Sequence, residues 1–296
     1  MTTTRVADAR TLHPLAAFYA IAVAGIFPLI FVSGRLVGDL ASPLQIMFLR
    51  YAGGFLTIVV VALFRGETFK TMSSPKPSRH LMRAFCGALG GATLIYGNAE
   101  IPVVDVTAIS LLSPVFLILL GISILGDRLT VWRTAGIVVS LAGALLIVAS
   151  RGAFSHADLD YLIPVLVVVV GSVLLAVESL FIKILASTDR PLVTLGSVNL
   201  LGMLVLLIPA LLTWRSPGWV NLALLGLGPL AIFGQYLNIR ANQLARVSLL
   251  APLSYTSLVF AALIGWAFFA ELPTPGTIAG AVVIVLGGAW LALGRR

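Results

Sequence analysis

The chain has 296 residues, of which 59% are hydrophobic and 10% are charged, with a mean hydropathy of +1.08 and a formal net charge of +8. A soluble domain must cover its surface with polar groups, and about 25% of its residues are typically charged. The composition therefore excludes a soluble enzyme, a disordered chain and a disulfide-stapled secreted domain, and it indicates an integral membrane protein.

The predicted elements are membrane-spanning helices, each of which needs about 20 apolar residues. The runs are continuous, which favours helices over the alternating strands of a porin-like barrel. The first run lacks a cleavage site, so we expect a span rather than a signal peptide. Ten runs cover residues 14–34, 44–64, 81–99, 105–125, 132–149, 161–184, 192–212, 220–239, 248–269 and 275–293.

The distribution of basic residues predicts the orientation of these spans. With ten spans, 15 lysines and arginines fall on the side of both termini and 3 fall on the other side, while Arg50 lies within a span. Basic loops stay in the cytoplasm, so we expect a multi-pass protein of the bacterial inner (plasma) membrane with both termini cytoplasmic. This orientation explains the positive charge better than nucleic-acid binding does, and no nucleic-acid partner is expected.

The sequence contains no arrangement of residues typical of metal or nucleotide chemistry. Cys86 is the single cysteine, and the histidines His13, His80 and His156 lie in polar stretches. No HExxH, CxxC or GxxxxGK[ST] pattern occurs, and these patterns would indicate zinc, redox or ATP-binding sites. We therefore expect no enzymatic activity, no cofactor, no bound metal and no obligate protein partner other than membrane lipids.

The two halves of the chain repeat one another. A shift of 144 residues aligns Asn98 with Asn242, Ser113 with Ser257, and Gly121 with Gly265. The first two spans of each half match only in position. Five spans per half force the second copy to enter the membrane in the opposite sense, which is a transporter architecture. We expect one five-helix repeat in residues 1–150 and a second, inverted repeat in residues 151–296.

The sequence resembles the EamA-type family of the drug/metabolite transporter superfamily. The residues that carry the resemblance are Leu111–Phe116, Gly126–Thr130 and Gly136 in the first half, and Ala251–Tyr255, Leu258–Ala261, Gly265–Trp266 and Glu271 in the second. The resemblance implies an all-α membrane fold of ten helices in two inverted repeats and the export of small metabolites. In layout the chain is similar to YddG-type exporters of aromatic amino acids. Asp127 departs from the glutamate common in the family.

Two charged residues inside predicted spans are candidates for substrate contact, because intramembrane charges are rare and costly. Glu178 in span six is a candidate acceptor for an amine or a proton. Alternatively, it pairs with Lys183 or another helix, or it snorkels toward the inner surface. Arg50 in span two is a candidate carboxylate ligand, or it snorkels to the surface or caps helix carbonyls.

Polar and aromatic residues within the spans extend the predicted cavity wall. For the serines and amides the alternative is close helix packing or interhelical hydrogen bonding, and for the tryptophan it is lipid contact. Prolines in spans four and nine, Pro114 and Pro252, leave nearby carbonyls free for a ligand. These candidates are Tyr96, Asn98, Ser110, Ser113, Gln235, Asn238, Tyr255, Ser257 and Trp266.

The functional prediction is a secondary transporter that exports small metabolites from the cytoplasm by alternating access through a central cavity. Amino acids, aromatic or otherwise neutral, are the first substrate class, and this choice follows from the resemblance alone. Export of lipophilic drugs or other metabolites is the alternative. A lipid scramblase or a membrane-embedded enzyme is the alternative from a different functional class. No histidine lies in a predicted span, where an enzyme would need a catalytic base.

Overall fold

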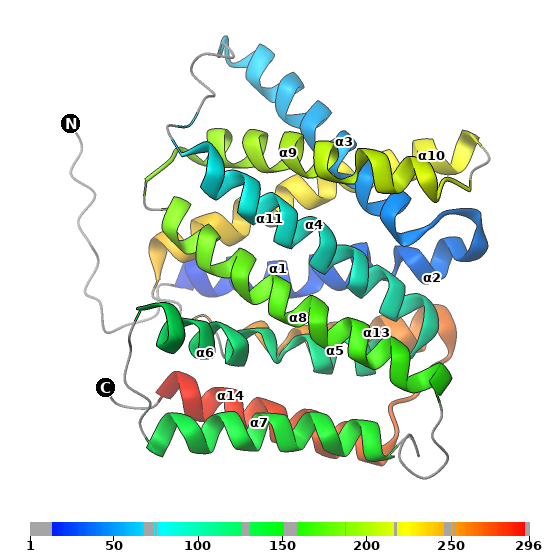
Figure 1. Ribbon diagram of the computed structural model, residues 1–296, viewed down its shortest axis with the longest axis vertical. Coiled ribbons are helices and arrows are strands. Elements are labelled where there is room, and N and C mark those ends of the chain that lie inside the picture. Colours follow the sequence, from blue (N-terminus) through cyan, green and yellow to red (C-terminus); the bar gives the residue numbers. More distant parts are fainter. Residues whose placement is uncertain are drawn as a thin grey trace.

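A computed structural model describes residues 14–67, 74, 76–125, 131–150, 159–186, 188–215, 218–245, 250 and 253–293. Within these ranges the chain is helical apart from short connections (Figure 1). The helices coincide with the ten apolar runs, some as broken pairs. The predicted residues Gly126–Thr130, Ala251 and Pro252 lie outside the described ranges.

The first half begins with a broken helix and continues with longer ones. Three of its long helices start at prolines, which fit the first turn because the N–H groups there have no partner within the helix. The elements are α1 (Pro14–Phe31), α2 (Ser33–Val37), the short helix η1 (Gly38–Leu40), α3 (Pro43–Phe64), α4 (Pro77–Glu100), α5 (Val103–Ser110), α6 (Ser113–Leu125) and α7 (Val131–Ser150).

The second half follows the same plan. Its elements are α8 (Leu159–Ala186), α9 (Pro191–Leu212), α10 (Gly218–Leu225), α11 (Leu227–Leu244), α13 (Ser257–Phe269) and α14 (Pro275–Leu293). Helices α6 and α13 begin and end 144 residues apart, and α4 and α11 end 144 residues apart. Equivalent helices of the two halves therefore share boundaries at equivalent residues. Helix α11 extends five residues beyond the predicted end of span eight.

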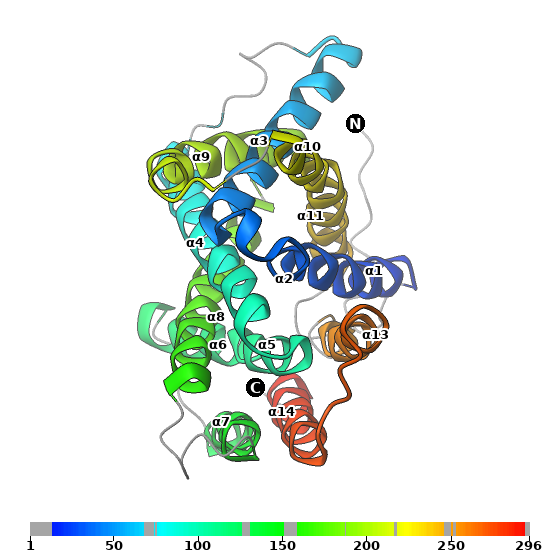
Figure 2. The ribbon, with the colours of Figure 1, turned by 90° about the vertical axis from the view of Figure 1, so that its right-hand side faces the viewer.

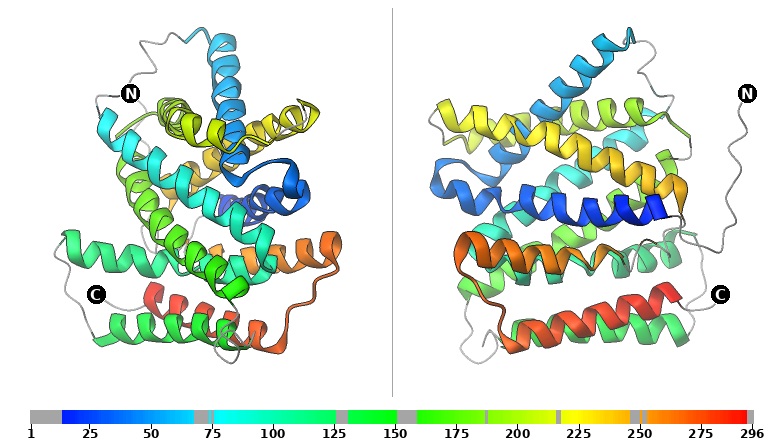
Figure 3. Two further views of the ribbon diagram at one scale, coloured as in Figure 1. Left: turned by 45° about the vertical axis from the view of Figure 1, so that its right-hand side comes forward. Right: turned by 180° about the vertical axis from the view of Figure 1, so that it is seen from behind.

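The helices pack in pairs, and each pair joins one helix of the first half to one helix of the second half. Helix α4 packs on α8 as α11 packs on α1, and α3 packs on its own counterpart α9. Figure 2 shows α1, α11 and α13 on one side of the molecule and α4, α8 and α6 on the other. Helices α7 and α14 form a separate pair at one edge, which both views of Figure 3 confirm. The interior of the bundle therefore lies between the side that contains α1 and the side that contains α8.

The outer surface of the bundle is apolar, and charges are buried inside it. Phe64, Leu212 and Trp219 are exposed, whereas Arg50, Arg83 and Asp105 are buried. This distribution suits a hydrocarbon solvent. By length and composition, five helical stretches among the described residues are able to cross a membrane: Pro14–Leu40, Pro43–Phe64, Leu159–Leu185, Pro191–Leu212 and Gly218–Leu244.

Candidate substrate cavity

Three adjoining hollows occupy the interior between the two sides of the bundle. The Arg50 hollow, of about 280 Å³, lies in the centre and is lined by Arg50, Arg83 and Glu178. The Lys183 hollow, of about 200 Å³, reaches toward the end where α8 and α11 finish. The Asn98 hollow, also about 200 Å³, reaches toward the opposite end. Ser254 lines all three, so the hollows form one path along the bundle axis.

Three charged side chains from three helices meet at the Arg50 hollow. Nε of Arg83 on α4 lies 3.9 Å from Oε1 of Glu178 on α8. Glu178 is also close enough to Arg50 on α3 for electrostatic attraction. Nε of Arg50 and both Nε and Nη1 of Arg83 are buried without a hydrogen-bond partner. Such orphaned donors are costly in a low-dielectric interior, so the site favours the entry of hydrogen-bond acceptors.

Neighbouring residues fix where these charges lie. The guanidinium carbon of Arg50 lies 3.9 Å from the ring centroid of Tyr51, a cation–π contact that holds the guanidinium over the ring. Gly87 on α4 faces Glu178, and a Cβ atom at position 87 would lie 2.7 Å from the carboxylate carbon and from Oε1. The absence of a side chain at Gly87 therefore makes the room that the Glu178 carboxylate occupies.

Breaks in the fourth and ninth spans bring polar groups to the cavity. Leu111 and Leu112 form a turn between α5 and α6, and Pro114 follows in the first turn of α6. Pro114 has no N–H, so the carbonyl of Ser110 receives no helical hydrogen bond from it. Ser110 and Ser113 both line the Arg50 hollow at this break. The corresponding turn at Tyr255 and Thr256 precedes α13.

The two end hollows have equivalent walls. Asn98, Val106 and Ser257 line the Asn98 hollow, while their repeat counterparts Asn242, Leu250 and Ser113 line the Lys183 hollow. Oδ1 of Asn98 and Oγ of Ser257 are buried without a partner. The internal repeat therefore produces two similar half-paths that meet at the central charges.

An ion pair lies at the end of the bundle next to the Asn98 hollow. Arg35 on α2 forms an ion pair with Glu271, which follows α13. The second carboxylate oxygen of Glu271 accepts a hydrogen bond of 3.2 Å from the backbone N–H of Val103, where α5 begins. The Arg35 guanidinium also lies 4.7 Å from the Phe269 ring centroid. These contacts join the ends of spans one, four and nine across the path.

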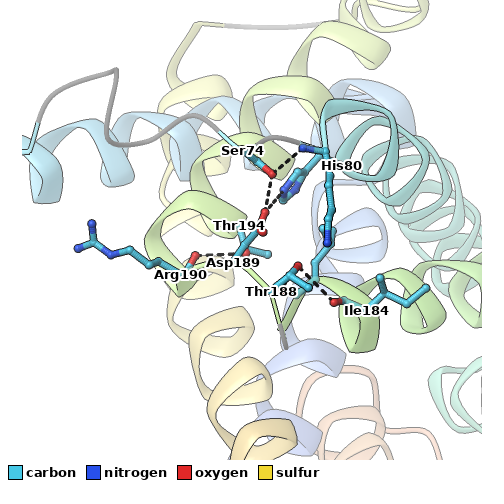
Figure 4. A network of polar contacts seen from close by, with 9 residues as sticks. Ser74, His80, Ile184, Thr188, Asp189, Arg190 and Thr194 are labelled. Carbon is cyan, nitrogen blue, oxygen red and sulfur yellow. Dashed lines mark hydrogen bonds and ion pairs between the residues drawn. The ribbon is translucent and has the colours of Figure 1, made fainter. Parts of the chain in front are cut away.

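A polar network joins α4 to the α8–α9 connection at the opposite end (Figure 4). The Ser74 hydroxyl donates to Asp189 Oδ2 at 2.6 Å, and His80 Nε2 lies 2.8 Å from the same oxygen. Burial alone would raise the pKa of Asp189, but hydrogen bonds from Ser74, His80 and Thr188 outweigh it and lower that pKa. Burial lowers the pKa of His80, although Asp189 partly opposes the shift. His80 therefore donates its Nε2 proton to an ionised carboxylate.

The structure brings most of the sequence-predicted residues to the path. Arg50, Glu178, Ser110, Ser113, Gln235 and Asn238 line the Arg50 hollow, and Asn98 and Ser257 line the Asn98 hollow. Tyr96 is half-buried outside the walls of these hollows, and Tyr255 is buried in an apolar cluster. Trp266 is 62% exposed on the surface of the bundle.

Sequence reasoning missed Arg83, Tyr51, Lys183 and Ser254 as cavity residues. Arg83 was counted with the cytoplasmic cations because it lies only two residues inside the start of the predicted span 81–99. Helix α4 instead starts at Pro77, so Arg83 lies in its second turn, one turn from Gly87. The proline at position 77 is the signal that could have identified this earlier start.

The buried carboxylate of Asp105 was also missed. Tyr161 donates to Oδ2 of Asp105 at 3.2 Å and Thr277 donates to Oδ1 at 2.9 Å. These bonds join α5 to α8 and α14, and Asp105 does not line the three hollows. Its position favours a structural role.

Comparison with known proteins agrees with the repeated architecture. The sequence profile of the EamA-like transporter family matches residues 14–149 and 162–293. One solved crystal structure superposes with a TM-score of 0.63 at 21% identity, covering 94% of this chain and 96% of the other. This likeness concerns the fold alone.

Several characterised relatives are transporters of small molecules. The chain is 30% identical to the pseudopaline exporter CntI of Pseudomonas aeruginosa over 85% of this chain and 86% of that protein. It is 23% identical to an S-adenosylmethionine uptake transporter of Rickettsia prowazekii, over 86% of this chain and 84% of that protein. It is 30% identical to a riboflavin transporter of Rhizobium johnstonii, over 78% of this chain and 76% of that protein. The family predicted from sequence is confirmed, and these relatives are not aromatic amino-acid exporters.

Proposed function

The chain is a member of the EamA-like transporter family, and we propose that it exports small metabolites from the cytoplasm by alternating access, with amino acids as the first substrate class. The protein is a multi-pass membrane transporter of a small molecule. The proposal adds the direction, the substrate class and the mechanism to that description.

The equivalent walls of the two end hollows carry this proposal. Two similar half-paths related by the internal repeat give two states of similar energy, each open to one side. In this proposal the Arg35–Glu271 pair is the contact that closes the Asn98 end, whereas Lys183 and Asn242 line the path toward the other end. In the proposed cycle these two ends open in turn around the central charges, with repeats of residues 1–150 and 151–296 as the moving units.

The proposed orientation places the Lys183 hollow toward the cytoplasm, following the excess of lysine and arginine on that side. The arrangement with the Arg35–Glu271 pair closed then faces inward. Such a state accepts substrate from the cytoplasm, as export requires. Arg50 and Glu178 are the proposed contacts for the carboxylate and the amine of an amino acid.

Flux measurements in proteoliposomes test the proposal. Protein-containing vesicles and empty vesicles are loaded with labelled phenylalanine, threonine or a cationic dye, and efflux is followed. We expect amino-acid efflux above that of empty vesicles and loss of that efflux in Arg50→Gln. Flux of the dye alone would support drug export, and lipid flip without solute flux would support a scramblase; either result contradicts the proposal.

A further inference from the structure

The charges that line the path do not balance, and this imbalance narrows the substrate class. Arg50 and Arg83 line the Arg50 hollow, and their side chains are respectively 4% and 1% exposed. Glu178 is the one acidic residue in the described walls of the three hollows. The centre of the path therefore carries two cations against one carboxylate. In a low-dielectric interior such an excess requires a compensating anion.

The one ion pair in this centre leaves binding capacity on both arginines. The 3.9 Å separation of Arg83 Nε and Glu178 Oε1 is longer than a hydrogen bond, and Arg83 Nη1 is unpartnered as well. Among the described residues, no carboxylate forms an ion pair with Arg50. A guanidinium presents parallel N–H donors that match the two oxygens of a carboxylate. Each arginine can therefore accept a carboxylate of the substrate.

Glu178 supplies the complementary acceptor. Its carboxylate lies against Gly87 on the cavity wall, and its side chain is 16% exposed. This position leaves the carboxylate accessible from the hollow while it stays near Arg83. A substrate amine at this point would form a charge-assisted hydrogen bond.

Simpler ligands leave the site incompletely paired. A neutral amino acid carries no net charge, so the positive excess at the centre would remain. An organic cation would add to the positive excess. Lys183, exposed at the other hollow, adds a further positive charge along the path, and such a charge attracts anions during entry.

We propose that the Arg50 hollow binds a net-anionic metabolite that carries two carboxylates and one amine. One carboxylate pairs with Arg50, the other pairs with Arg83, and the amine pairs with Glu178. This inference rests on the transport function proposed above and narrows its substrate from amino acids in general to amino-dicarboxylates.

Matched ligand pairs test the inference on the purified protein. Glutamate and glutamine differ in one carboxylate at nearly constant shape, as do N-(carboxymethyl)phenylalanine and N-(carbamoylmethyl)phenylalanine at larger size. Calorimetric titration should show at least about tenfold tighter binding of the dicarboxylate in at least one pair, the loss expected when a buried charge pair is broken. Equal binding within both pairs, or tighter binding of the amide, would overturn the inference.

Variants assign the carboxylates to the arginines. Arg50→Gln should reduce the preference for the dicarboxylate to less than about threefold, and Arg50→Lys should retain part of it because the charge remains without the fork. The control is Arg215→Gln, which changes a 60% exposed arginine away from the path and should leave the preference intact. A full preference in Arg50→Gln would overturn the assignment. If that variant does not fold, binding of the matched ligand pairs to the unmodified protein still tests whether the hollow prefers a dicarboxylate.

The result separates this inference from the proposed function. Amino-acid flux with no preference for the dicarboxylates would remove the inference and leave amino-acid export in place. Absence of flux and of binding for every ligand would remove both.

Discussion

Gly87 offers a way to move the Glu178 carboxylate without removing it. In Gly87→Ala the added Cβ would lie 2.7 Å from the carboxylate carbon and Oε1 of Glu178, whereas ordinary contact begins at 3.4 Å. The carboxylate must therefore shift by about 0.7 Å. It is the far end of a flexible side chain, so the shift itself costs little. Alanine also favours the helix over glycine by about 1 kcal/mol.

We therefore expect a folded variant whose free energy of unfolding stays within about 1 kcal/mol of the parent protein. Loss of a charge-assisted hydrogen bond to the substrate amine is worth about 1.5–3 kcal/mol, which weakens substrate binding about 10- to 100-fold. Calorimetric titration and the KM in proteoliposomes measure binding, and thermal melting measures stability. The control is Gly218→Ala, whose added Cβ has no atom within 4 Å. Unchanged binding in a folded Gly87→Ala variant would refute the role given to Glu178.

Three further predictions concern the two ends of the path and a strained turn. Arg35→Gln should open the end next to the Asn98 hollow. In a Cys86→Ser, Ser257→Cys background, labelling by an impermeant maleimide added outside should rise about fivefold, the change expected if the partly exposed ion pair contributes about 1 kcal/mol. An unchanged labelling rate would contradict this prediction. Burial lowers the pKa of His80, which faces Asp189 and Arg83, so unfolding takes up a proton and the stability present above about pH 6.5 is lost as the pH falls. The melting temperature should therefore change less between pH 7.5 and 5.5 in His80→Gln than in the parent protein. Equal changes in both proteins would show that His80 does not cause the pH dependence. Ala270 has a φ of 53° just before Glu271, and Ala270→Gly should raise the free energy of unfolding by about 0.5–1 kcal/mol, whereas a lower melting temperature would show that the turn is unstrained.

The sequence alone determined the spans, the repeat and two of the three charges that line the Arg50 hollow. The thickness of the hydrocarbon requires long apolar runs, so hydropathy located most span ends to within a few residues, and the first stretch and α11 extend five or six residues further. The shift of 144 residues aligned Ser113 with Ser257, and the structure begins α6 and α13 at these two equivalent residues. Glu178 and Arg50 were identified because a charge inside a membrane is rare and costly.

Only the tertiary structure decided which side chains meet. Most spans are apolar around their whole circumference, so hydropathy does not show which face of a helix points inward. The rotation of each helix is set by packing against its neighbours. That packing turns Arg83 toward Glu178, buries Tyr255 among apolar residues and exposes Trp266 on the surface. The positive excess at the centre of the path follows from that placement of Arg83, which the sequence by itself puts only at the cytoplasmic edge of span three.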